Sequence, residues 1–137
     1  MTARYLLDTD TCIFLMRRES PALERKLLSV PLEQQAMSVV TLAELKYGVQ
    51  ASSPARRKQN QSVLEQLVLH LAVLDWPQQA SDHYAEIRHD LKRRGAQLGA
   101  ADLMIAAHAR ALGAVVVTHN AKDFGRVKGL VVEDWMR

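Results

Sequence analysis

Short apolar runs alternate with longer stretches of helical spacing along this chain. Five runs predict strands, at residues 4–8, 36–40, 71–76, 114–118 and 130–134. Between them, the apolar spacing predicts helices over residues 11–18, 21–30, 41–51, 81–94 and 100–112, with another that starts at Ser53-Pro54. Strands separated by helices require crossover connections. The pattern therefore predicts an α/β fold with a mostly parallel sheet of four to five strands, flanked by helices.

The size and composition of the chain fit one globular domain. It has 137 residues, of which 48% are hydrophobic and 24% are charged. These values are ordinary for a soluble protein with one core. Because no repeat or linker interrupts the pattern, we expect a single domain over residues 1–137.

Compartment signals are few. The first ten residues carry only a brief apolar run, unlike a signal peptide, and no uninterrupted apolar stretch approaches membrane-spanning length. The single cysteine, Cys12, has no partner for an internal disulfide. We therefore expect a cytoplasmic protein that has no contact with a membrane.

The charge distribution favours a polyanionic partner. The formal net charge is +3, and the basic residues gather in clusters. Any one cluster can be a solvated helix face, but their sum suits a nucleic acid. The clusters are Arg17-Arg18, Arg25-Lys26, Arg56-Arg57-Lys58 and Lys92-Arg93-Arg94.

Acidic residues lie where the predicted strands end. Asp8 and Asp10 follow the first strand, and Glu44 and Asp102 fall in the first turns of their predicted helices. Asn120 and Asp123 follow the strand at 114–118. The carboxyl ends of parallel strands share one edge of the sheet, which is where ligands bind. Residues distant in the sequence should converge there.

Each acid also has a structural interpretation. Asp10 can cap the first helix, and Thr41 with Glu44 fits a capping box. Asp102 can complement a helix dipole, and Asp8 can form an Asx-turn. Together, however, several carboxylates at one edge repel each other unless a cation offsets them. With no cysteine array or histidine pair nearby, that cation is expected to be Mg²⁺ or Mn²⁺, which suits hydrolysis of a phosphodiester.

Three segments resemble the PIN-domain ribonucleases, specifically VapC-type toxins of bacterial toxin-antitoxin pairs. They are "LLDTDTCIFL", "SVVTLAELKYG" and "LGAADLMIAAHARALGAVVVTHNAKDF". The resemblance implies that Asp8, Glu44 and Asp102 bind the catalytic metal. It also implies supporting or second-site roles for four further positions, and Asn120 stands where many members of the family have aspartate. These positions are Asp10, Thr118, Asn120 and Asp123.

The same resemblance implies a function. It suggests an endonuclease directed at tRNA or another structured RNA and held inactive by a cognate antitoxin. A homodimer and a toxin-antitoxin hetero-oligomer are expected with it.

Three other functions remain open from the residues alone. "DTDTC" approximates the motif of haloacid-dehalogenase phosphatases, in which Asp8 would be the nucleophile and Asp10 the acid/base. A receiver-like module would use Asp75 as its phosphoacceptor. A degenerate PIN-like protein would bind RNA without cutting it. Among the five histidines we expect structural or surface roles, and His119, beside Asn120, is the one to test.

Overall fold

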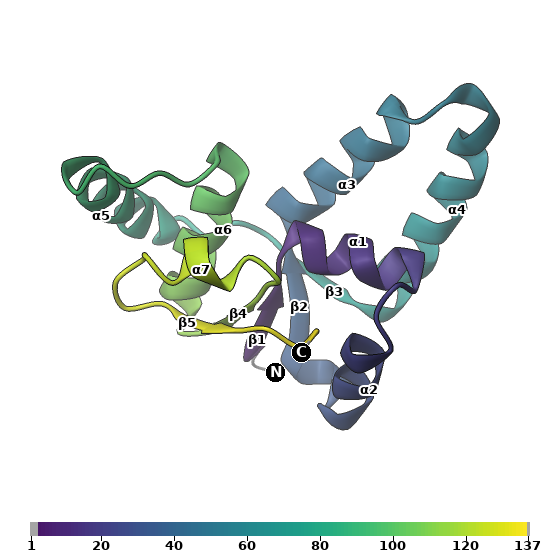
Figure 1. Cartoon of the computed structure of the whole chain (residues 1–137), viewed down its shortest axis with the longest axis horizontal. Helices are drawn as coiled ribbons and strands as arrows, with labels where there is room; N and C mark the ends of the chain where they lie inside the picture. Colours follow the sequence, from purple (N-terminus) through teal and green to yellow (C-terminus); the bar gives the residue numbers. More distant parts are fainter. Residues whose placement is uncertain (1–2, 137) are drawn as a thin grey trace.

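The computed structural model describes residues 3–136 and contains a five-stranded sheet. The strand order is β3-β2-β1-β4-β5, and all four neighbouring pairs are parallel (Figure 1). The α/β prediction is therefore confirmed. The strands are β1 (Tyr5–Leu7), β2 (Gln35–Ser38), β3 (Ala72–Leu74), β4 (Val115–Val117) and β5 (Val131–Glu133).

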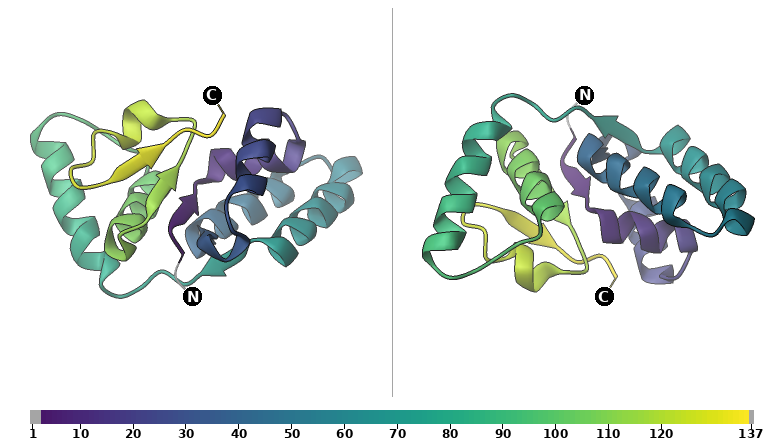
Figure 2. Two further views of the ribbon diagram at one scale, coloured as in Figure 1. Left: turned by 90° about the horizontal axis from the view of Figure 1, so that it is seen from below. Right: turned by 90° about the horizontal axis from the view of Figure 1, so that it is seen from above.

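Helices cover both faces of this sheet, with α5, α6 and α7 on one flank and α1 to α4 on the other (Figure 2). The first group of helices is α1 (Thr9–Arg17), α2 (Pro21–Ser29), α3 (Val39–Ala51) and α4 (Pro54–His70). The second group is α5 (Ala80–Arg93), α6 (Ala100–Leu112) and α7 (Ala121–Phe124). A short 3₁₀ helix, η1 (Leu32–Gln34), precedes β2.

Alternation along the strands divides the core into two halves. In β1, Leu6 packs with α5 and α6, whereas Leu7 packs with the helices of the opposite face. Val116 and Val117 in β4 divide in the same way. Successive side chains of a strand point to opposite faces, so each central strand contributes to both halves. This two-sided burial explains why the strands are continuous apolar runs.

Local signals fix most of the helix ends. Ser20 accepts a hydrogen bond from the Leu23 amide at the start of α2, with Pro21 as the first helical residue. Gly113 ends α6 with φ of 68°, the left-handed conformation that glycine adopts most easily.

Several element ends differ from the prediction by one or two residues, and two differences matter most for the candidate site. The second strand ends at Ser38 rather than residue 40, because Ser38 accepts a hydrogen bond from the Val40 amide and caps α3. The helix α7 was not predicted, since four residues are too few to reveal a helical period. Within residues 3–136 no helix is long and apolar enough to span a membrane, and Cys12 is a buried free thiol.

Candidate metal and catalytic site

Asp8 lies at the carboxyl end of β1 and is only 1% exposed. Its Oδ1 accepts a hydrogen bond of 2.9 Å from the Thr11 amide, which makes Asp8 the N-cap of α1. Burial raises the pKa of Asp8 above its ordinary value, and hydrogen bonds with Thr118 and Thr11 oppose part of that rise. Its position is fixed by both the sheet and the helix.

Asp102 lies in the first turn of α6 and titrates far from its ordinary range. Burial, followed by the negative charges of Asp8, Asp10, Asp123 and Glu44, raises its pKa to about 6. A carboxyl group feels such charges only when they lie near it. The predicted convergence of these acids is therefore present as an electrostatic cluster, with Asp8 the largest charge contribution.

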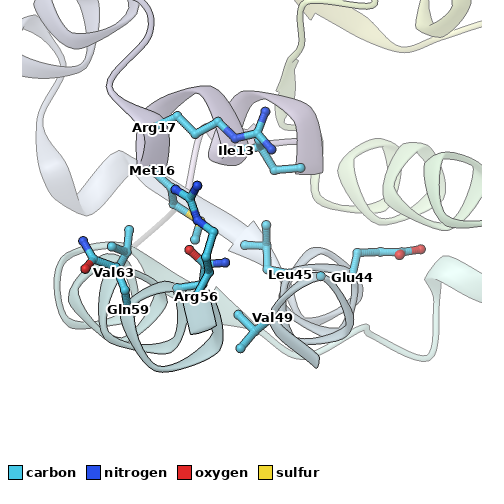
Figure 3. Close-up of a pocket in the computed structure, with 11 residues that line it drawn as sticks. Ile13, Met16, Arg17, Glu44, Leu45, Val49, Arg56, Gln59 and Val63 are labelled. Atoms are coloured by element: carbon cyan, nitrogen blue, oxygen red, sulfur yellow. The ribbon is translucent and has the colours of Figure 1, made fainter. Parts of the chain in front are cut away.

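Glu44 belongs to the second turn of α3, not the first. Because Ser38 is the N-cap, Thr41 lies inside the helix and is fully buried, with Oγ1 atoms of Thr41 and Thr9 3.4 Å apart. The capping box suggested by the sequence is therefore wrong. Glu44 is exposed, and its carboxylate points away from Arg17 and Arg56 (Figure 3).

Asp10 does not cap α1, which corrects the role that the sequence suggested for it. The cap is Asp8, and Asp10 is an exposed residue of the first turn. Its negative charge there complements the helix dipole. It also contributes to the raised pKa of Asp102, so it lies near the cluster.

The resemblance implies cleavage of RNA, and we expect Asp10→Asn to keep that activity within about tenfold of wild type, because only a neighbouring charge is lost. Initial rates at saturating Mg²⁺, with Asp8→Asn measured in parallel, test this. A complete loss of cleavage with Asp10→Asn would instead make Asp10 a direct metal ligand.

The segment after β4 carries the remaining candidate residues. Thr118 is fully buried, and its Oγ1 accepts a hydrogen bond of 2.8 Å from the Asn120 amide. Asp123 forms an ion pair of 3.4 Å with Arg126. Thr118 therefore links Asp8 to the turn that leads into α7.

The acids suit a hard divalent ion that keeps part of its water shell, rather than an ion enclosed entirely by protein ligands. In the described part of the chain, no three histidine, cysteine, aspartate or glutamate side chains form a ready metal-binding group. Mg²⁺ keeps several waters and needs only one or two protein carboxylates. The charge cluster around Asp102 supplies the electrostatic part of such a site, because a cation would relieve its repulsion.

A groove of about 400 Å³ opens beside Glu44, between α1, α3 and α4. Its floor is apolar, and Arg17 and Arg56 point into it from α1 and α4 (Figure 3). Gly48 lines it in the interior of α3, where an added Cβ would meet nothing within 4 Å. The apolar floor is formed by Ile13, Met16, Leu45, Val49 and Val63.

Sequence reasoning missed this groove and two histidine contacts. His108 is buried, with Nδ1 2.8 Å from Ser38 Oγ, and it joins α6 to the start of α3. His119 Nδ1 lies 3.1 Å from Asp134 Oδ2. A glycine within a helix, Gly48, was the only sequence signal for the groove. Nothing in the sequence paired either histidine with its partner.

Comparison with known proteins agrees with the fold. The family model for the PIN domain matches residues 5–130. A tRNA(fMet)-specific endonuclease VapC from Salmonella typhimurium is 39% identical over 96% of this chain and 98% of its own length. Ribonuclease VapC2 from Rickettsia felis is 36% identical over 96% of this chain and 97% of its own.

Solved structures give the same result. DNA-bound VapBC from Salmonella typhimurium matches with a TM-score of 0.90 and 36% identity, covering 98% of this chain and 99% of that one. VapBC2 from Rickettsia felis, bound to a DNA fragment from its promoter, matches with a TM-score of 0.88 and 34% identity, covering 96% and 98%. The chain belongs to the PIN domain family and, within it, to the VapC-type ribonucleases.

Proposed function

We propose that this protein is a metal-dependent endoribonuclease and the toxin of a type II toxin-antitoxin pair. The observation that carries the proposal is the pKa of Asp102, raised to about 6 by burial and by four neighbouring acids. Such a concentration of like charge destabilises the folded protein unless a cation or a proton offsets it. Structures usually tolerate this cost at functional sites.

Asp8, Glu44 and Asp102 would hold Mg²⁺ or Mn²⁺. Asp123, whose negative charge acts on Asp102, and Asn120, at the start of the same short helix, would support a second ion or its waters. When bound, the ion polarises the phosphoryl group and lowers the pKa of the attacking water. Water then forms the new bond to phosphorus, and the bond to the leaving ribose oxygen breaks.

The residues around the acids set their geometry. The Thr11 amide holds Asp8 Oδ1, and Thr118 holds the same side chain from β4. The N-terminus of α6, whose dipole is positive, carries Asp102. These contacts fix the carboxylates before the substrate arrives, which reduces the cost of reaching the reactive arrangement.

The proposed substrate is tRNA or another structured RNA held by the basic clusters. Two relatives that are 39% and 40% identical are tRNA(fMet)-specific endonucleases, which makes tRNA the first substrate to test. The net charge of +3 suits contacts with the phosphate backbone.

The phosphatase alternative fits the site less well. A nucleophilic aspartate must reach the substrate, but Asp8 is 1% exposed and its Oδ1 is already bonded to the Thr11 amide. A degenerate protein that binds RNA without cutting it would need no cluster of acids, since carboxylates repel phosphates.

Incubation of the purified protein with a tRNA pool and Mg²⁺, in parallel with a generic phosphate monoester, tests the proposal. We expect discrete RNA fragments and no turnover of the monoester. Turnover of the monoester without RNA cleavage would support the phosphatase, and RNA binding with neither reaction would support the degenerate alternative.

The groove beside Glu44 is the proposed position of an inhibitory antitoxin segment. Solved relatives are VapBC complexes. Arg17 and Arg56 favour a segment that combines acidic with apolar side chains, since the floor of the groove is apolar. A segment in this groove would end next to Glu44 and obstruct the acids. We expect a homodimer that assembles with the antitoxin into a hetero-oligomer.

Gly48 offers a test of this docking surface. Glycine within a helix costs about 1 kcal/mol relative to alanine, and the monomer has open space for a side chain at this position. Gly48→Ala should raise the melting temperature and keep the affinity for the antitoxin. Gly48→Leu should also raise it, because leucine is a good helix former, but should fill the groove and weaken antitoxin binding by at least about tenfold.

Affinity for the purified antitoxin encoded by the adjacent reading frame is the measurement, with RNA cleavage by the free variants as the control. If Gly48→Leu is stable, active and inhibited by the antitoxin as wild type is, the segment does not occupy this groove.

A further inference from the structure

His119 is held in a fixed orientation at the catalytic edge of the sheet. It follows Thr118, and its side chain is 51% exposed, whereas the side chain of Asp134 is only 9% exposed. Nδ1 of the imidazole lies 3.1 Å from Asp134 Oδ2. The other oxygen of Asp134 accepts a hydrogen bond of 2.9 Å from the Met136 amide, which fixes the carboxylate itself.

A second contact fixes the plane of the ring. The ring of Phe14 in α1 meets the imidazole edge-on, with the ring centroids 5.6 Å apart and an interplanar angle of 74°. Phe14 is four residues after Asp10, so both lie on the same face of α1, about 6 Å apart along the axis. His119 therefore packs against the helix that carries Asp10 in its first turn.

The bond to Asp134 decides which nitrogen is available to a ligand. A carboxylate only accepts hydrogen bonds, so Nδ1 of the neutral ring carries the proton. Nε2 is then an acceptor, and the hydrogen bond that the structure shows for this ring within residues 3–136 is made by Nδ1. A neutral Nε2 cannot bond to a phosphate oxygen, which is also an acceptor. A ribose 2′-hydroxyl can donate to it.

We propose that Nε2 of His119 accepts a hydrogen bond from the 2′-hydroxyl of a nucleotide next to the scissile phosphate. His119 is then a specificity residue that favours RNA over DNA, and Asp134 is the positioning residue that fixes its tautomer. The inference rests on the proposed ribonuclease function and adds the group on the substrate that is recognised.

A purely structural role explains the geometry less completely. The bond between His119 and Asp134 does link the end of β4 to the segment after β5. For that purpose, however, the ring need not be half exposed or packed against the helix that carries Asp10. A fixed, half-exposed acceptor at the carboxyl edge of the sheet, where the acids also lie, is better explained by contact with the substrate.

Single 2′-deoxy substitutions in the RNA, combined with a variant of His119, test the contact directly. The substrate is the shortest RNA fragment that wild type cleaves at one bond, with 2′-deoxyribose placed in turn at each nucleotide on either side of that bond. His119→Phe keeps an aromatic ring against Phe14 and removes the acceptor. His119→Leu is the second variant, because it keeps an apolar side chain against Phe14 and offers no acceptor.

At one position, wild type should cleave the 2′-deoxy substrate about fivefold to tenfold more slowly than RNA. His119→Phe should cleave RNA more slowly by a similar factor and show no further loss on that deoxy substrate. Circular dichroism melting checks that each variant is folded, and His119→Leu replaces His119→Phe if the latter is not.

The contact is absent if each 2′-deoxy substitution slows cleavage by the same factor in the variants as in wild type. An equal slowing of RNA and all deoxy substrates would mean that the ring stacks or contacts phosphate instead. If wild type cleaves RNA but the ratio of RNA cleavage to cleavage of the deoxy substrates is the same in the variants, only this inference fails. If wild type cleaves no RNA with Mg²⁺ or Mn²⁺, the proposed function fails and the inference fails with it.

Discussion

Replacing Asp102 by asparagine should reduce RNA cleavage by at least about a hundredfold while raising the melting temperature of the metal-free protein at neutral pH. The loss of activity follows from the role proposed for Asp102 as a metal ligand, because stabilisation of transition-state charge by a metal ion contributes several kcal/mol. The gain in stability follows from removing a charge that burial and four other acids disfavour.

The gain should depend on pH in a defined direction. The folded protein holds the Asp102 proton up to a pKa of about 6, whereas the unfolded chain releases it near 3.8. The raised pKa therefore favours the folded state below about pH 4, and this advantage is lost as the pH rises through 6. Asparagine carries no such charge, so the stability of Asp102→Asn should exceed that of wild type most clearly above pH 6.

After allowance for solvent screening of a partly exposed group, we expect a gain of about 1 kcal/mol, or about 3 to 6 °C in melting temperature. The loss of a favourable contact with the helix dipole is smaller, at about 0.5 kcal/mol. Thermal melts of wild type and Asp102→Asn in chelator at pH 4.5 and pH 7.5 measure the difference in stability. If the two proteins melt at the same temperature at both pH values, or if the variant is the less stable at pH 7.5, the raised pKa is contradicted.

The second large effect concerns Asp8, for which two substitutions separate two roles. Asp8→Asn keeps an oxygen for the Thr11 amide, and asparagine is as good an N-cap as aspartate. It removes the negative charge that would attract the divalent ion. We expect cleavage to fall by at least about a hundredfold with no loss of stability.

Asp8→Ala removes both the charge and the cap. It should lose the same activity and, in addition, about 1 kcal/mol of unfolding free energy. Denaturant unfolding of both variants in chelator, beside cleavage rates in Mg²⁺, separates these effects. If Asp8→Asn retains wild-type cleavage, Asp8 serves the fold and not the reaction.

Much of the fold follows from periodicity. Each predicted strand overlaps an observed one, since strands buried on both faces are continuous apolar runs between helical stretches. The short helix α7 and the strand order could not be predicted in this way. The order depends on which helices cover which face, and that is decided by packing between distant residues.

The candidate site was predictable in composition but not in detail. Asp8 and Asp10 are two residues apart, and both are acceptable caps, so local preference could not choose between them. The structure makes Asp8 the cap because the Thr11 amide reaches its Oδ1. For α3, the earlier serine, Ser38, caps the helix and displaces Thr41 into its interior. This shift of two residues in the end of the strand moved Thr41 from the expected cap into the helix, and Glu44 from the first turn into the second.

Side-chain contacts between residues that are distant in the sequence could not be predicted from the pattern of apolar and polar positions. The contact between His119 and Asp134 spans 15 residues, and that between His108 and Ser38 spans 70. Burial lowers the pKa of His108, in keeping with a neutral ring inside the core. Neither pairing has a spacing that a sequence motif could contain.

The central claim is that the acids around Asp102 act together by binding a divalent ion that RNA cleavage requires. Cleavage of a tRNA pool by protein treated with a chelator, followed by titration of Mg²⁺ or Mn²⁺, tests it most directly. We predict no cleavage after chelation, saturable recovery in wild type, and no recovery in Asp102→Asn. Undiminished cleavage after complete removal of divalent ions, with the same rate in Asp102→Asn, would contradict it.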